Sequence, residues 1–335
     1  MTDQDLEWSI RARIDGKTKP PGSLGRVEDL AARIALLQRS SAPRMETCEL
    51  TIFAADHGIA AEGVSAYPQE VTRQMLGSFL DGGAASTVFA ATFGVPVRVV
   101  DAGIAGDPPL DPRLLSRRIG PGTADFLQEP AMTRSQLRHA LDLGEVLGAA
   151  SVTDAVAYGE MGIANTSSAA LLAHRLTGLD LGILTGRGTG LDDDGLARKR
   201  AVLAAASARV PGDLDTKGAL AQFGGFEIAM MAGAMIGAAG KRRLILVDGF
   251  IASTAALVAE SLSPECREAM VFAHVSAEAG HAPLLGHMRA EPLLSLGMRL
   301  GEGTGALMSW PLVRAATAML NEMASFDDAG VSGRA

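Results

Sequence analysis

Six short apolar runs, each ending in a glycine or a polar residue, most constrain how this chain can fold. They occupy residues 50–55, 97–100, 155–158, 181–184, 244–247 and 270–273, and segments with helical spacing of apolar residues separate them. Short buried runs that alternate with helices are typical of a parallel sheet covered by helices. The sequence therefore predicts a doubly wound α/β fold with a mostly parallel, six-stranded sheet.

The two ends of the chain have a helical pattern instead. Residues 1–45 are expected to be helical, with one loop at 19–26, and residues 307–323 form an apolar helix-like run. We therefore expect a small helical domain made of residues 1–45 with 307–335. Residues 46–306 would form a large α/β domain that binds substrate and carries out catalysis.

Composition excludes several classes of protein. The net charge of −8, without a cluster of Lys and Arg, argues against a nucleic-acid surface. Cys48 and Cys266 have neither metal-like spacing nor a disulfide framework. Acidic residues precede the first apolar stretch, so the N-terminus does not have the pattern of a signal peptide. The apolar segment 223–239 is interrupted by Glu227 and several glycines. We expect a buried helix there rather than a membrane span, and a cytoplasmic protein.

Residues 300–305, with the sequence LGEGTG, place one carboxylate, Glu302, between glycines just before an apolar helix. Glycine permits φ > 0 and lets a backbone approach a ligand closely. A carboxylate in a tight, weakly solvated turn can have its pKa raised toward neutrality, which suits a general base. The residues alone leave open an ordinary surface turn with an incidental glutamate.

Two more glycine-rich turns follow predicted strands. Residues 159–168 open a helix, where backbone N–H groups and hydroxyls favour an anion such as phosphate, although ordinary helix capping is the alternative. Residues 186–194 form the second turn, and Lys199 beyond it could reach a phosphate or simply lie at the surface. The aspartates at 192–194 suit a helix N-terminus better than a divalent metal.

Other polar residues also follow the predicted strands, where open parallel sheets bind ligands. They are Asp56, His57, Asp101, Glu160, Asp248, His274 and Glu278. Residues 301–306 match a dinucleotide-binding pattern, but no acidic strand end follows them. A nucleophile elbow, a Walker lysine motif and zinc spacing of the histidines are also missing from the sequence. We therefore expect no metal and no cofactor.

Taken together, these segments resemble the nicotinate-nucleotide–dimethylbenzimidazole phosphoribosyltransferase family. The matching stretches, in the family's order, are 19–26, 55–72, 159–168, 186–199, 224–228, 248–250, 276–281 and 300–305. The resemblance implies a parallel α/β domain with a small helical domain, assembled as a homodimer. It also implies transfer of phosphoribose from nicotinate mononucleotide to 5,6-dimethylbenzimidazole in cobalamin nucleotide-loop assembly, with inversion at the anomeric carbon.

The resemblance also implies roles for individual residues, with Glu302 as the general base. It places Glu160 near the ribose and Asp248 at a strand end facing the site. The phosphate would be bound by the backbone of Gly162, Ile163, Ala164, Asn165 and Thr166, with Lys199 and Ser276 nearby. The base pocket would be lined by Ser65, Tyr67, Gln74 and Leu300.

The chain departs from the family's usual pattern at four positions. Ala164 and Ser167 stand where Gly and Thr are usual, and Ala273 and Val275 where Ser and Arg are commoner. These departures bear on substrate affinity more than on the reaction. Two alternatives stay open: a protein that binds a nucleotide or ribazole without turnover, and a phosphoribosyltransferase for a different base.

Overall fold

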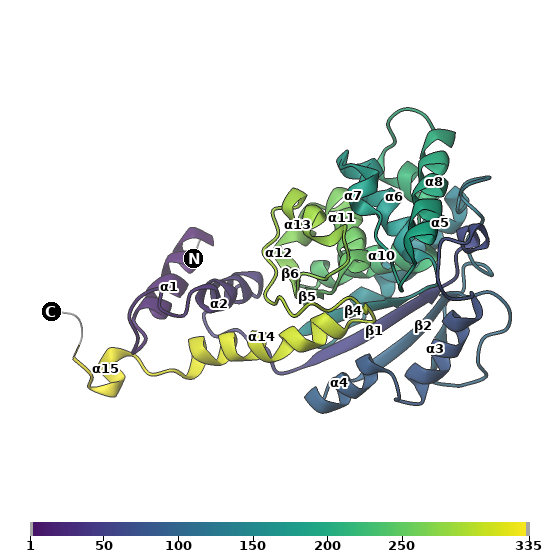
Figure 1. The fold of residues 1–335 in the computed structure, drawn as a ribbon. Helices are drawn as coiled ribbons and strands as arrows, with labels where there is room; N and C mark the ends of the chain where they lie inside the picture. The colour runs from purple at the N-terminus through teal and green to yellow at the C-terminus, as the bar shows by residue number, and fades with distance from the viewer. Residues whose placement is uncertain (1–2, 333–335) are drawn as a thin grey trace.

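The computed structural model describes residues 3–332 and shows one six-stranded sheet between two layers of helices (Figure 1). The strands are β1 (Cys48–Ala55), β2 (Val97–Gly103), β3 (Leu114–Ser116), β4 (Ala155–Met161), β5 (Leu244–Val247) and β6 (Met270–Phe272). Their order is β3-β2-β1-β4-β5-β6, and all neighbouring pairs are parallel. The predicted doubly wound α/β fold is confirmed.

The prediction was wrong about one of the six strands. Residues 181–184 form the short helix α7 (Leu181–Leu184), because the Asp180 side chain caps its N-terminus by accepting a hydrogen bond from Ile183 N–H. The remaining strand is β3, which has only three residues, each at least partly exposed. An edge strand this short needs no apolar run, so the pattern could not reveal it.

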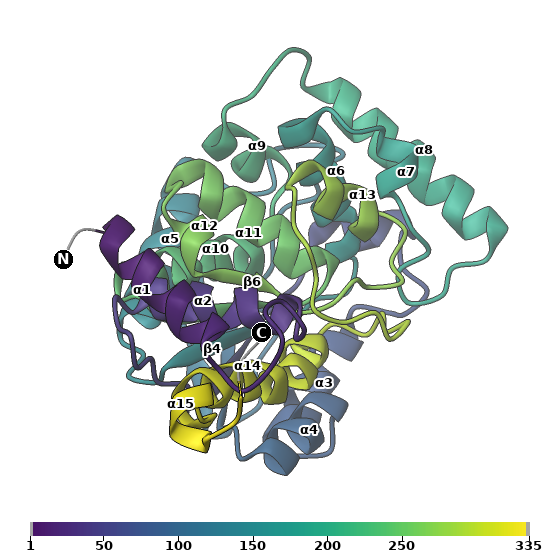
Figure 2. The ribbon, with the colours of Figure 1, turned by 90° about the vertical axis from the view of Figure 1, so that its left-hand side faces the viewer.

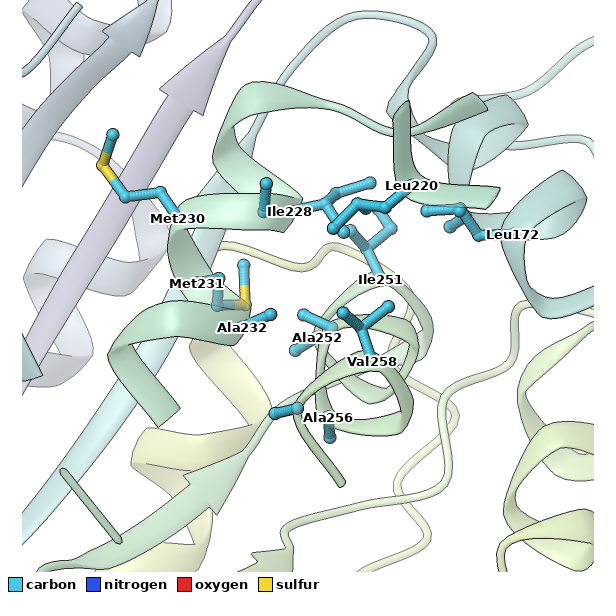
Figure 3. Close-up of a cluster of buried hydrophobic side chains, with 14 of the residues drawn as sticks. Leu172, Leu220, Ile228, Met230, Met231, Ala232, Ile251, Ala252, Ala256 and Val258 are labelled. Carbon is cyan, nitrogen blue, oxygen red and sulfur yellow. The ribbon is translucent and has the colours of Figure 1, made fainter. Parts of the chain in front are cut away.

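Alternate residues of each strand face the two helical layers. In β1, Phe53 belongs to the apolar cluster on one face of the sheet, and Leu50 and Ile52 belong to the cluster on the other. The first face is covered mainly by α5 (Arg134–Ala149), α6 (Asn165–Thr177), α9 (Thr216–Phe223), α10 (Phe226–Gly240) and α11 (Phe250–Leu262). Figure 3 shows the centre of this layer, where Met231 and Ala232 of α10 lie near Ala252 and Val258 of α11.

Helix α10 lies at the centre of the first layer and is almost wholly buried. This result confirms the buried helix predicted within residues 223–239. Among residues 3–332, no helix is both long and apolar enough to cross a membrane. The other helices on this side are α8 (Asp193–Arg209), α12 (Cys266–Ala269) and α13 (His281–His287).

The second face is covered by helices from both ends of the chain and by two helices between β1 and β2. The helices from the ends are α1 (Asp3–Asp15), α2 (Arg26–Leu37) and α14 (Thr304–Glu322), and the other two are α3 (Glu70–Leu80) and α4 (Ala85–Phe93). The short η1 (Gly58–Glu62) contributes Ile59 to the first-face cluster, and α15 (Phe326–Ala329) lies near the C-terminus. Figures 1 and 2 show α14 running from the sheet toward α1 and α2. Leu30 of α2 and Trp310 of α14 share one apolar cluster with Leu50.

The helical character of both chain ends is therefore confirmed. Their separation as a small domain stays a prediction, and residues 1–2 and 333–335 of that domain lie outside the described residues.

The strand order places the site. From β1 the chain moves outward to β2 and β3, then returns to the other side of β1 as β4. In an open α/β sheet, ligands bind beyond the carboxyl ends of the strands where the order reverses. At that edge Phe53 of β1 is paired with Glu160 of β4.

Candidate active site

A cavity of about 450 Å³ opens at the carboxyl end of β4. Its walls come from the loop before α3, the turn from β4 into α6, residues 187–189, the start of α11, and residues 276–278 and 299–302. Most of the residues predicted for the site line it: Ser65, Tyr67, Glu160, Gly162, Ile163, Ala164, Asn165, Thr166, Ser276, Leu300 and Glu302. The fold thus brings together segments more than two hundred residues apart in the sequence.

Three predicted site residues do not line the cavity. Lys199 is buried beneath it, where its Nζ donates a hydrogen bond of 2.7 Å to Thr166 Oγ1. Asp248 is buried after β5, and its carboxylate accepts hydrogen bonds from the backbone N–H groups of Gly303 and Ala306. Gln74 is exposed on α3 and lies outside the lining residues.

Glu302 stands in a turn of three successive left-handed residues. The φ angles are +83° at Gly301, +61° at Glu302 and +81° at Gly303. A side chain with positive φ is strained, so the turn depends on its surroundings, including the two hydrogen bonds to Asp248. The glycines flanking the carboxylate therefore serve the backbone geometry expected from the sequence.

Residue Glu302 is 5 % exposed and lines the cavity. Burial raises its pKa above the usual range, and the nearby charge of Asp248 acts in the same direction. Hydrogen bonds from Ser86 oppose this rise. A carboxylate with a raised pKa is a stronger base, so the side chain is suited to accepting a proton.

Glu160 lies at the end of β4, beside the Glu302 turn. Burial raises its pKa to about 8, and the Asn165 amide, which donates a hydrogen bond to it, limits the rise. A Cβ atom at Gly301 would lie only 2.3 Å from Glu160 Oε1, so the two segments touch. The raised pKa favours the protonated form of Glu160, which can donate a hydrogen bond to a ligand hydroxyl.

The N-terminus of α6 opens into the same cavity. Its N-cap residue is Ala164, with φ of +75° and no capping side chain. The first-turn N–H groups and the helix dipole therefore favour an anion. Lys199 adds positive charge behind Thr166, although burial lowers its pKa to about 8.

Four polar residues that line the cavity were given no role by the sequence analysis. They are Arg187, Thr189, Glu278 and Arg299. Arg299 donates to the carbonyl of Gly188, so it braces the second glycine-rich turn. The turn at 186–194 and Glu278 were noticed in the sequence, whereas Arg299 had no signal beyond its position next to the LGEGTG stretch.

The other polar residues at the strand ends form buried networks rather than cavity walls. His57 Nε2 lies 2.7 Å from Glu227 Oε1, and both side chains are fully buried. Although burial lowers the His57 pKa, the Glu227 charge and hydrogen bond raise it overall. Among residues 3–332, no three His, Cys, Asp or Glu side chains are grouped as a metal site requires.

Comparisons with known proteins point to a single family. A phosphoribosyltransferase family model, DBI_PRT, matches residues 1–331. A protein of Aromatoleum aromaticum named nicotinate-nucleotide–dimethylbenzimidazole phosphoribosyltransferase is 51 % identical over 337 residues, covering 100 % of this chain and 98 % of that protein. A protein of the same name from Chloroflexus aurantiacus is 47 % identical over 334 residues, covering 98 % of this chain and 95 % of its own length.

The fold of this chain also matches that of a solved structure over nearly its full length. The crystal structure of CobT from Thermus thermophilus matches with a TM-score of 0.95 and 41 % identity, covering 98 % of this chain and 100 % of that one. The full-length matches in sequence and fold show that the chain belongs to the nicotinate-nucleotide–dimethylbenzimidazole phosphoribosyltransferase family.

Proposed function

We propose that this chain transfers phosphoribose from nicotinate mononucleotide to 5,6-dimethylbenzimidazole, giving α-ribazole 5′-phosphate and nicotinate in cobalamin nucleotide-loop assembly. One observation carries the proposal. The buried carboxylate of Glu302 lines the same cavity as the uncapped N-terminus of α6, which suits a phosphate. A base and an anion site in one cavity match a reaction between a nucleotide and a weakly acidic ring.

Glu302 acts as the general base. One ring nitrogen of the benzimidazole attacks C1′, and the bond from C1′ to the nicotinate nitrogen breaks with inversion at the anomeric carbon. Glu302 accepts the proton from the other ring nitrogen. The pyridine nitrogen is quaternary before the bond breaks and takes up the bonding electrons, so nicotinate leaves without protonation. The protein mainly positions the two substrates and stabilises an oxocarbenium-like centre.

The remaining residues bind the nucleotide. The backbone of Gly162–Thr166 holds the phosphate, with Lys199 behind it and Ser276 on the cavity wall. Glu160 contacts the ribose. Asp248 acts on the site through the Glu302 turn, because it accepts hydrogen bonds from the backbone N–H groups of Gly303 in that turn and of Ala306 in the first turn of α14.

The acceptor base lies against the wall formed by Ser65, Tyr67 and Leu300. Val71 and Met75 add apolar surface from α3, and Gln74 would have to turn toward the cavity to contact the base. Apolar walls suit a flat aromatic ring but discriminate one methyl group by only about 1–3 kcal/mol. The choice of base is therefore the least constrained part of the proposal.

We further propose that the protein works in the cytoplasm as a homodimer, without a nucleic-acid partner, a metal or a cofactor. The acidic net charge of −8 supports the exclusion of nucleic acid. The homodimer is proposed from the family resemblance.

The first experiment mixes the purified protein with nicotinate mononucleotide and 5,6-dimethylbenzimidazole and follows nicotinate and α-ribazole 5′-phosphate by chromatography. Stoichiometric appearance of both products supports the proposal. Binding of both substrates without either product supports a non-catalytic binding protein. Nicotinate release without ribazole product points to a different acceptor, which competition among candidate bases would identify.

A further inference from the structure

Helix α4 begins without a cap from its own chain segment. Its N-cap residue is Ala84, which has an extended backbone and no side chain that could accept a hydrogen bond. The N–H groups in the first turn of a helix need acceptors from elsewhere, particularly where the helix end is buried. Ser86, the second residue of α4, is fully buried.

The acceptor at this helix end is the Glu302 carboxylate. Ser86 Oγ donates a hydrogen bond of 3.2 Å to Glu302 Oε2, although the two residues are 216 positions apart. The Ser86 backbone N–H also faces this carboxylate and acts to lower its pKa. The next hydroxyl, of Thr87, donates instead to the carbonyl of Ala84. Glu302 therefore places a hydrogen-bonded carboxylate at the N-terminus of α4, which lies beside α14 (Figure 2).

The charged groups that face Glu302 from other elements are mostly acidic. Asp248 approaches from the end of β5 and Glu160 from the end of β4. His274 lies against Gly305 and Asp248. Helix α4 carries no charged residue. Ionisation of Glu302 is thus opposed by burial and by the charge of Asp248, whereas the hydrogen bond from Ser86 favours the ionised form.

We propose that Ser86 is the positioning residue for the general base: its hydroxyl fixes Glu302 Oε2 against α4, leaves Oε1 for the substrate, and donates a hydrogen bond that the ionised carboxylate accepts. This inference rests on the proposed function. Helix α4 supplies no residue to the cavity wall, but the inference gives it a part in the reaction.

The pH dependence of kcat tests the inference. Ser86→Ala removes a hydrogen bond that favours the charged form of Glu302. The acid limb of the profile is therefore expected to shift to higher pH by about one unit. Ser86→Cys, with a weaker donor of similar size, should give an intermediate shift. Thr87→Val is the matched control, because it removes a buried hydroxyl from the same helix turn without touching Glu302, and its acid limb should not move. An unshifted acid limb in Ser86→Ala would overturn the inference.

A second measurement separates this inference from the proposed function. If the unmodified protein shows no turnover, the proposed function fails, but the contact can still be tested by a double-mutant cycle of unfolding free energies. Ser86→Ala and Glu302→Ala should be non-additive if the two side chains interact. Additive effects would refute the contact itself. If Ser86→Ala does not fold, the cycle is carried out with Ser86→Cys.

Discussion

Gly159 of β4 lies directly against the backbone of Glu302: a Cβ atom at Gly159 would be 2.4 Å from the Glu302 carbonyl carbon. The strand therefore supports the turn that presents the proposed base, and the support requires a residue without a side chain. Because the atom in the way belongs to the backbone, the turn itself would have to move.

Gly159→Ala should therefore displace Glu302. A misplacement near 1 Å can cost on the order of 10²-fold in rate, and we expect turnover to fall at least about tenfold. Steady-state kinetics and thermal unfolding of the variant would measure both consequences. Gly240→Ala is the control, since nothing lies within 4 Å of a Cβ there. Full activity in Gly159→Ala would show that the turn can adjust.

Glu302→Gln should lower turnover by on the order of 10²-fold or more and leave the fold intact, because the amide keeps the shape but cannot accept the proton. The KM for nicotinate mononucleotide should change little. Glu322→Gln, at the exposed far end of α14, serves as the control. Near-normal turnover in Glu302→Gln would refute the general-base assignment.

The affinity for the nucleotide should fall at alkaline pH. The pKa of Lys199 is about 8, so the ammonium group behind Thr166 is charged below that pH and loses its charge above it. The KM for nicotinate mononucleotide should therefore rise by up to about tenfold per pH unit above about 8.

A substitution separates Lys199 from Glu160, which has a pKa of about 8 and gains negative charge over the same range. Lys199→Arg keeps a positive charge at all these pH values and should flatten the rise in KM. If KM rises equally in Lys199→Arg and the unmodified protein, the effect belongs to Glu160 rather than to Lys199.

Ala164→Gly should stabilise the protein. Ala164 has φ of +75°, a conformation that costs an alanine more than a glycine, and the gain is about 1 kcal/mol in unfolding free energy. Loss of the methyl group should also lower the KM for the nucleotide or leave it unchanged. Ala169→Gly, in the buried interior of α6, should have the opposite effect on stability in the same denaturant titration. Destabilisation by Ala164→Gly would mean that the strain is absent.

The sequence was informative where a local pattern and the final structure had the same cause. Burial on both faces of the sheet requires an apolar run, so the strands β1, β2, β4, β5 and β6 were visible. The run at 181–184 was also apolar, but a capping residue, Asp180, decided its conformation. Glycines around Glu302 were visible because positive φ favours glycine.

Other parts of the site depend on tertiary packing and leave no local trace. The hydrogen bond between Ser86 and Glu302 joins two segments 216 positions apart. A serine in an apolar helix gives no sequence pattern from which its hydrogen-bond partner can be predicted. Gln74 shows the converse limit, since the family resemblance assigned it to the base pocket, whereas its side chain is exposed on α3 and does not line the cavity. Arg299 entered the wall only because the 299–302 segment folds over the second glycine-rich turn.

Helices α5 and α10 approach each other through paired glycines, and this contact gives the last prediction. A Cβ atom at Gly144 of α5 would lie 1.9 Å from the Met230 carbonyl oxygen, and one at Gly233 of α10 would lie 2.2 Å from the Leu141 oxygen. Gly144→Ala would have to push two buried backbones apart, so we expect a loss of about 3 kcal/mol in unfolding free energy. Gly77→Ala in α3, where the added Cβ meets nothing within 4 Å, should instead stabilise by up to about 1 kcal/mol. Urea titrations of the two variants test the pair, and equal midpoints would show that the α5–α10 contact is looser than its geometry indicates.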